Sequence, residues 1–150
     1  MNFQAQIDQD LTQAMKARQA ERLAVIRMLK SALKNAAIEK GGMSFILDNA
    51  SALAVVRKEL KKRQDAIEGF EKGNRPELVA KEKAEAEILA AYLPKPLTAE
   101  ELSAIVSSAV TETGATSKAQ MSAVMKLATE RAAGRADGKA LSAAVSAALR

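Results

Sequence analysis

The fold prediction starts from Glu87-Ile-Leu-Ala-Ala-Tyr-Leu-Pro94-Lys-Pro-Leu-Thr98-Ala-Glu-Glu101-Leu102. Pro94 and Pro96 bias the residues before them away from the α region, so a helix that runs to about Tyr92 has to stop there. Thr98 and Glu101 then have the spacing of a capping box, in which the two side chains satisfy the first backbone N–H groups of a new helix. The stretch predicts a helix end, a Pro-containing hinge and a helix start.

Helix-forming residues dominate on both sides of this stretch. The 150 residues include only seven glycines and three prolines, and Ala, Leu, Glu, Lys, Arg and Gln are abundant without β-branched alternation. These preferences predict an all-α protein. We expect a four-helix N-terminal domain at 1–93, joined by the hinge to a three-helix C-terminal domain at 94–150. The expected helices cover roughly residues 3–17, 19–39, 48 or 51 to 72, 75–92, 98–113, 117–133 and 138–149.

Polar residues and glycines set these boundaries. Gly41-Gly42 ends the second helix, and Asn74 is expected to be the N-cap of the fourth. Ser117-Lys-Ala-Gln120 has the spacing of another capping box, and Asp137 is expected to cap the last helix. Tyr92 is expected to pack at the hinge with its hydroxyl group in water.

The second helix has two faces. Ile26, Leu29 and Leu33 recur at helical spacing, whereas Arg27, Lys30 and Lys34 fall on another side. The segment after this helix, Gly41-Gly-Met-Ser-Phe-Ile-Leu-Asp48, is apolar. Its Phe45, Ile46 and Leu47 are expected either to plug the core or to form an exposed contact patch.

The composition excludes several kinds of chemistry. The chain has neither cysteine nor histidine, which removes disulfides, Cys–His and Ser–His nucleophile pairs, and most zinc ligation. No Gly-rich phosphate loop is present. We therefore expect no catalytic, cofactor-binding or metal-binding residue. Four acidic residues are expected to form a solvated helix face and not a metal or general-acid site: Glu77, Glu82, Glu85 and Glu87.

The N-terminus lacks the basic flank and apolar run of a signal peptide, and no segment approaches the roughly 18 apolar residues of a membrane span. The sequence thus predicts a cytoplasmic protein that does not enter membranes. We expect it to be a monomer.

Positive charge is concentrated in the first half of the chain. The net charge is +5, and Lys16 to Arg63 holds 12 Lys or Arg against four Asp or Glu. Such a stretch is typical of a polyanion-binding surface, and also of an ordinary solvated helix. The residues expected to contact RNA phosphates are Arg27, Lys30 and Lys34 in the N-terminal domain, and Lys118, Lys126, Arg131, Arg135 and Lys139 around the C-terminal turn. Few aromatic residues are available to stack on bases, so RNA would be bound by its shape and backbone.

Several stretches carry a family resemblance: Glu21-Arg-Leu-Ala-Val-Ile-Arg-Met-Leu-Lys30, Arg63-Gln-Asp-Ala-Ile67, the 87–102 stretch, Met121-Ser-Ala-Val-Met125-Lys126 and Gly134-Arg-Ala-Asp-Gly-Lys139. Over nearly its whole length the chain resembles the YqeY family of small free-standing proteins. Its C-terminal part also resembles the tail of the B subunit of tRNA-dependent amidotransferases. Residues 41–48 depart from the YqeY pattern, which usually has a polar, acidic segment there.

The resemblance implies a link to carbon–nitrogen ligases that use glutamine as amide donor, whose tail faces tRNA and whose ammonia-producing and activating machinery lies elsewhere. We therefore expect a tRNA-binding or amidotransferase-associated accessory module without catalysis of its own. Its expected partners are tRNA and an amidotransferase or aminoacyl-tRNA synthetase. A protein-interaction adaptor without RNA binding is the first alternative, and an autonomous glutamine-dependent ligase is the second.

Overall fold

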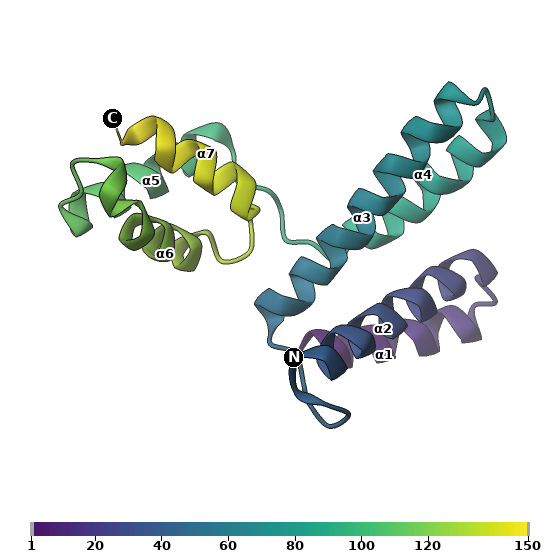
Figure 1. The fold of residues 1–150 in the computed structure, drawn as a ribbon. Helices are drawn as coiled ribbons and strands as arrows, with labels where there is room; N and C mark the ends of the chain where they lie inside the picture. The colour runs from purple at the N-terminus through teal and green to yellow at the C-terminus, as the bar shows by residue number, and fades with distance from the viewer. Residues whose placement is uncertain (1, 150) are drawn as a thin grey trace. The chain divides into compact units, whose positions relative to one another are not determined.

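The computed structural model describes residues 2–149, which form seven α-helices and one short 3₁₀-helix and contain no strand. The prediction of an all-α protein is confirmed. The chain divides into two compact units, Met1–Leu93 (unit 1) and Pro94–Arg150 (unit 2). Unit 1 holds α1 (Phe3–Lys16), α2 (Ala20–Gly41), α3 (Asn49–Lys72) and α4 (Pro76–Ala90) (Figure 1). Unit 2 holds α5 (Ala99–Thr113), the 3₁₀-helix η1 (Lys118–Gln120), α6 (Met121–Ala132) and α7 (Gly138–Ala148). A hinge at Pro94–Pro96 and the independence of the two domains stay predictions.

Four helix starts have side-chain caps, at Asn2, Asp48, Thr98 and Asp137, and the last two are those that the sequence predicts. Thr98 and Glu101 form the capping box: the Thr98 N–H donates to Glu101 Oε2 at 2.9 Å, and the Glu101 N–H donates to Thr98 Oγ1 at 3.1 Å. Asp137 accepts from the Ala140 N–H at 2.7 Å, and Asp48 caps α3 in the same way. Each cap satisfies a backbone group that the first helical turn leaves unpaired.

Two predicted caps are wrong. Asn74 does not cap α4; it has a left-handed φ of 54° and closes α3. The Asn74 N–H donates to the Glu71 carbonyl and the Arg75 N–H donates to the Phe70 carbonyl, which is the pattern of a Schellman motif. Asn is one of the few residues that tolerate this conformation, so a residue type that favours helix starts serves here at the end of a helix.

The expected capping box at Ser117 is also absent. The Ser117 side chain makes no capping bond, and residues 118–120 form the 3₁₀ turn η1. Gln120 Oε1 instead accepts from the backbone N–H of Thr116 at 2.7 Å. The bond therefore closes the loop before η1 and does not open α6.

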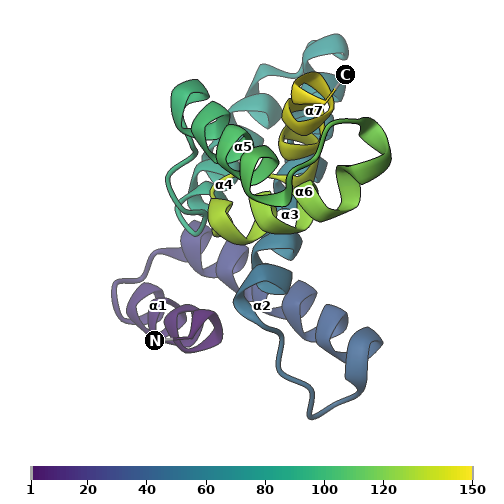
Figure 2. The same cartoon turned by 90° about the vertical axis from the view of Figure 1, so that its left-hand side faces the viewer.

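Unit 1 consists of two helical hairpins. α1 packs on α2 and α3 packs on α4, while α2 also contacts both α3 and α4; Figure 2 shows α1 and α2 in a second view. The predicted apolar face of α2 lies in the core, where Ile26, Leu29 and Leu33 are nearly inaccessible. Val56 of α3 and Leu89 of α4 complete the same cluster.

Tyr92 joins the end of α4 to α1. Its hydroxyl group donates a hydrogen bond to Asp10 Oδ2 at 2.8 Å, and its ring meets the Phe3 ring edge-on with centroids 5.8 Å apart. Burial first, and then the bond to Asp10, raises the pKa of Tyr92 above its ordinary value. The expectation of a hydroxyl group in water is therefore wrong, because the N-terminal helix supplies a carboxylate acceptor.

Unit 2 is a three-helix cluster in which α5, α6 and α7 contact one another. Its core is made of small and medium side chains, among them Val106, Val124, Leu141 and Val145. The Leu97 N–H donates to the Arg135 carbonyl at 3.1 Å, which holds the segment before α5 against the turn between α6 and α7.

Candidate functional site

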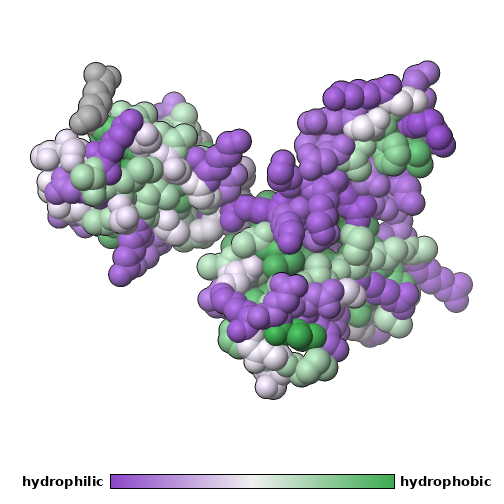
Figure 3. All heavy atoms as spheres, viewed as in Figure 1, coloured by the Kyte–Doolittle hydropathy of each residue, from purple (hydrophilic) through white to green (hydrophobic). Residues whose placement is uncertain are grey.

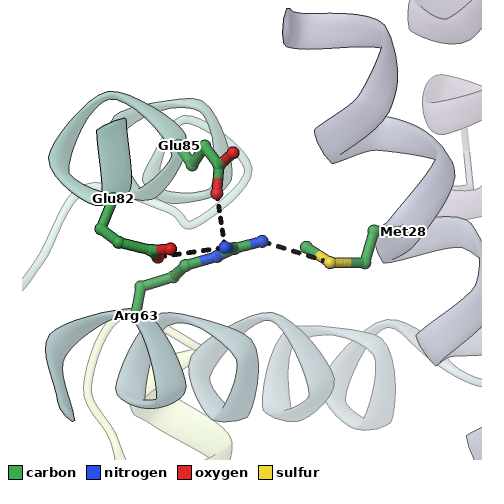
Figure 4. Close-up of polar contacts among 4 residues, drawn as sticks. All are labelled: Met28, Arg63, Glu82 and Glu85. Carbon is green, nitrogen blue, oxygen red and sulfur yellow. Dashed lines mark hydrogen bonds and ion pairs between the residues drawn. The ribbon is translucent and has the colours of Figure 1, made fainter. Parts of the chain in front are cut away.

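The acidic residues of α4 do not all form a solvated face. Arg63 of α3 places its Nη1 at 3.0 Å from Glu82 and also bonds Glu85, and these side chains are only 15 %, 16 % and 12 % exposed. Its Nη2 also lies 3.2 Å from the Met28 sulfur on α2 (Figure 4). A guanidinium has enough donors in a fixed fork to serve several acceptors at once. Arg63 thus ties three helices together, and the solvated-face prediction is wrong for Glu82 and Glu85.

The two arginines predicted to contact RNA in unit 2 are held by the protein. Arg131 bonds Glu112 and Ser108, both on α5. Arg135 donates from Nε to the Lys95 carbonyl at 2.9 Å and from Nη2 to Glu101 Oε2 at 3.1 Å. The hydrogen bond from Arg131 lowers the pKa of Glu112 below its usual range. The Thr98 N–H, followed by Arg135, lowers the pKa of Glu101 in the same way.

The predicted lysines of unit 2 are differently placed. Lys118, Lys126 and Lys139 are all exposed, and no ion pair or hydrogen bond of their side chains occurs within residues 2–149. Lys126 lies on the face of α6 away from its buried Val124 and Ala128, whereas Arg131 pairs with α5. The five predicted residues around the C-terminal turn therefore divide into two structural arginines and three free lysines.

The predicted residues of α2 lie along one flank of that helix, at spacings of three and four. Arg27 and Lys34 are exposed without a side-chain partner among the described residues. Lys30 pairs with Asp8 of α1 at 2.6 Å, and both side chains remain more than half exposed. An exposed pair of this kind contributes little to stability, so Lys30 is still accessible to a ligand.

A pocket lies between α1 and α2, beside the segment that follows α2. Its volume is about 290 Å³. Ile7 of α1 and Leu33 and Ala37 of α2 are buried beside it, and Lys30 and Lys34 form part of its rim. Met43, Phe45 and Ile46 form its wall and are exposed by 75 %, 38 % and 66 %. Figure 3 shows apolar residues, in green, at the surface of unit 1 among polar ones.

The two expectations for the apolar segment are each partly met. Leu47 is buried and belongs to the core of unit 1, whereas Phe45 and Ile46 form an exposed patch. Nothing in the sequence indicated that α1 would lie beside this segment and contribute Gln4, Ile7 and Asp8 to a common pocket. The exposed Met43 was also missed, although its place after two glycines is a signal for a projecting loop.

Among residues 2–149, no group of three or more acidic or histidine side chains is placed to hold a metal ion. In the same range, no helix is both long and apolar enough to cross a membrane.

The family model described as "Yqey-like protein" matches residues 4–149. The chain belongs to this family. Yqey-like membership confirms the family resemblance over most of the chain, whereas the resemblance to an amidotransferase tail stays a prediction.

Three relatives share part of this Yqey-like sequence. "Altered inheritance of mitochondria protein 41, mitochondrial" of Lachancea thermotolerans is 38 % identical over 110 residues, which cover 72 % of this chain and 58 % of that protein. The protein of the same name from Eremothecium gossypii is 32 % identical over 114 residues, covering 75 % of this chain and 61 % of its own length. An uncharacterised protein of Schizosaccharomyces pombe is 33 % identical over 94 residues, which cover 63 % of this chain and 74 % of that protein.

The relatives allow two comparisons, of chain length and of cellular compartment. This chain spans less than two thirds of the length of the two proteins named for mitochondrial inheritance. Both are named as mitochondrial, which contradicts the prediction of a cytoplasmic protein. That prediction rested on the lack of a secretory signal peptide and of a membrane span, and mitochondrial targeting uses neither pattern but an amphipathic, Arg-rich one.

Proposed function

We propose that this Yqey-like chain is a non-catalytic accessory module that binds tRNA, in association with a tRNA-dependent amidotransferase or an aminoacyl-tRNA synthetase. The observation that carries the proposal is a set of exposed basic side chains without an acidic partner among residues 2–149: Lys118, Lys126 and Lys139 in unit 2 and Arg27 and Lys34 on α2. Several carboxylates are already occupied, since Glu101 and Glu112 pair with arginines and Asp8 pairs with Lys30. The unpaired lysines are therefore available for phosphates.

The structure changes which residues should be tested. Replacing Arg131 or Arg135 removes contacts that hold α5 to α6 and to the 134–139 turn. A loss of RNA binding in such a variant would not distinguish a lost phosphate contact from damage to the structure of unit 2. The lysines can be changed without this ambiguity, because within residues 2–149 their side chains bond nothing.

The test compares two triple variants of the full chain by fluorescence anisotropy with labelled total tRNA. The first is Lys118→Gln/Lys126→Gln/Lys139→Gln. The matched control, Lys16→Gln/Lys72→Gln/Lys81→Gln, removes the same charge from exposed lysines elsewhere. We expect the first variant to weaken binding and to lower the slope of log K against log salt by about one for each phosphate that the protein no longer neutralises.

Binding to a control RNA duplex shows whether the protein prefers tRNA to other RNA. Binding of tRNA that exceeds binding of the duplex, and that falls in the first variant only, supports the proposal. An equal loss of tRNA affinity in both triple variants would show that net charge alone attracts RNA. Absence of tRNA binding at low salt would reject the proposal. The double variant Arg27→Gln/Lys34→Gln reports whether α2 also contacts the RNA.

A second candidate function is a protein-interaction adaptor that does not bind RNA. The observation that favours it is the exposure of Met43, Phe45 and Ile46 beside the pocket, since clustered apolar side chains at a surface commonly mark a binding site. If neither triple variant changes RNA binding and the wild-type chain discriminates no RNA, the adaptor function takes precedence.

A further inference from the structure

The segment between α2 and α3 is anchored at both ends and exposed in the middle. At its start, the Phe45 N–H donates to the Gly42 carbonyl at 3.1 Å in a tight turn. At its end, Leu47 is buried and Asp48 caps α3. Lys40 of α2 also donates to Ser51 Oγ at 2.8 Å, which joins the two helices across the segment. These contacts fix both ends of the segment, and the side chains of Met43 and Ile46 between them are exposed to solvent.

Phe45 owes its position to a glycine. A Cβ atom at Gly41 would lie 2.2 Å from Cδ2 of the Phe45 ring, so any larger residue at 41 would push the ring away. With glycine there, the ring lies against the end of α2 and forms one wall of the pocket. An apolar wall, an apolar floor and an exposed rim of lysines thus come together at one place.

The chemistry of this place favours one kind of occupant. We propose that the pocket between α1 and α2 binds an amphipathic helix of a partner protein, which inserts an apolar side chain beside Phe45 and sets an acidic side chain against Lys34. The pocket volume of about 290 Å³ lies at the small end of binding cavities and suits one large side chain better than a whole small-molecule ligand. Lys30 and Asp8 on its rim pair with each other, so Lys34 leaves one positive charge unpaired there, which favours an acidic flanking residue by charge complementarity.

The form of the partner follows from the fold. Residues 2–149 contain no strand, so they offer no sheet edge to which an extended peptide could add. Another common mode places the apolar face of a helix in a groove, with anchors spaced three and four residues apart. Met43 is suited to such a contact because its unbranched thioether side chain adapts to different shapes.

Other occupants fit less well. RNA would leave Met43 and Ile46 against phosphates without any gain from their apolar surface. A membrane surface would accept the side chains of Met43 and Ile46, but it has no protruding apolar side chain that could fill the pocket behind them. These occupants are nevertheless separate outcomes of the experiment.

The experiment uses two labelled amphipathic helical peptides of equal length with the same leucine face. One carries glutamate on both flanks of that face and the other carries lysine. Binding to the full chain is measured by fluorescence anisotropy. We expect the glutamate peptide to bind roughly tenfold more tightly than the lysine peptide, as one favourable charge contact allows. Ile46→Ser should weaken its binding by a similar factor, and Lys34→Glu should reverse the preference between the two peptides.

The matched controls are Met15→Ser, which removes an exposed apolar side chain of α1 outside the pocket, and Lys16→Glu, which makes the same charge change elsewhere. Neither should alter peptide binding. Equal binding of both peptides, no binding of the glutamate peptide, or equal effects of Ile46→Ser and Met15→Ser would overturn the proposal.

Two further measurements identify the occupant if peptide binding fails. Binding to phosphatidylglycerol vesicles that Ile46→Ser abolishes would overturn the proposal in favour of a membrane surface. A concentration-dependent dimer in sedimentation, abolished by the same variant, would overturn it in favour of a second copy of this chain. The tRNA test is decided by the triple variant of unit 2, and it shares Lys34 with the peptide test only through Arg27→Gln/Lys34→Gln. The failure of tRNA binding and the failure of peptide binding are therefore distinguishable.

Discussion

Replacing Arg63 with alanine tests whether the two hairpins of unit 1 depend on a shielded charge network. The guanidinium is held by Glu82 and Glu85 of α4 and reaches Met28 of α2. Its removal leaves two carboxylates on the same helix without a counter-charge, in a place that water reaches poorly. The unfolding free energy of unit 1 should therefore fall.

The exposures of the three side chains set the size of this effect. Breaking a fully buried ion pair costs about 3–5 kcal/mol, whereas an exposed pair contributes less than about 1 kcal/mol. The side chains of Arg63, Glu82 and Glu85 are 15 %, 16 % and 12 % exposed, which places them near the buried limit while leaving some hydration. The expected loss is about 2–4 kcal/mol, a large part of the roughly 5–15 kcal/mol typical of a whole domain.

The chain offers a spectroscopic probe of unit 1 alone. Tyr92 is its single tyrosine, and there is no tryptophan. Tyrosine fluorescence during urea unfolding therefore reports unit 1, while far-ultraviolet circular dichroism reports the helices of both units. Lys61→Ala is the matched control, because the Lys61–Asp65 pair is 3.7 Å apart and its side chains are 79 % and 64 % exposed. It should lose no more than about 0.5 kcal/mol.

A lysine at position 63 refines the test. Its ammonium group lacks the planar fork that serves several acceptors together. The unfolding free energy of Arg63→Lys should therefore lie between those of wild type and Arg63→Ala. If Arg63→Ala and Lys61→Ala lose the same free energy, within about 1 kcal/mol of wild type, the network contributes no more than a surface pair. The reasoning from burial would then be refuted.

Three further predictions concern single groups. Tyr92→Phe should lower the stability of unit 1 by about 1 kcal/mol. Because the folded pKa of Tyr92 is raised, its contribution is present below its ordinary pKa of 10.0 and is lost as pH rises above it, which the ultraviolet absorbance of tyrosinate can follow. The folded pKa of Glu101 is lowered, so its contribution is present above its ordinary pKa of 4.5 and is lost as pH falls; Glu101→Gln should remove this acid dependence from the amide NMR signals of unit 2. Arg18 has a left-handed φ of 55°, so Arg18→Gly should raise the stability of unit 1 by about 0.5–1 kcal/mol in the tyrosine-monitored urea assay.

Local patterns in the sequence were enough to predict the helices, the Thr98–Glu101 capping box and the apolar face of α2. Each depends on residues a few positions apart in the chain, whose spacing sets their relation once a helix forms. Asn74 shows the limit of such local reasoning. Its preference for helix ends is local, but whether it begins α4 or ends α3 depends on which backbone groups need a partner.

Which charged residues are free depends on the packing of the helices. Arg63, Arg131 and Arg135 carry the same charge as the exposed lysines, yet each is held by acceptors from a distant part of the chain. The pocket has the same origin, since α1 and the 42–48 segment are separated by the whole of α2 in the sequence and line one pocket in the fold. Charge and hydrophobicity belong to single residues and can be read in order along the chain. Pairing and enclosure depend on distances in space, which no stretch of sequence contains until the helices have packed.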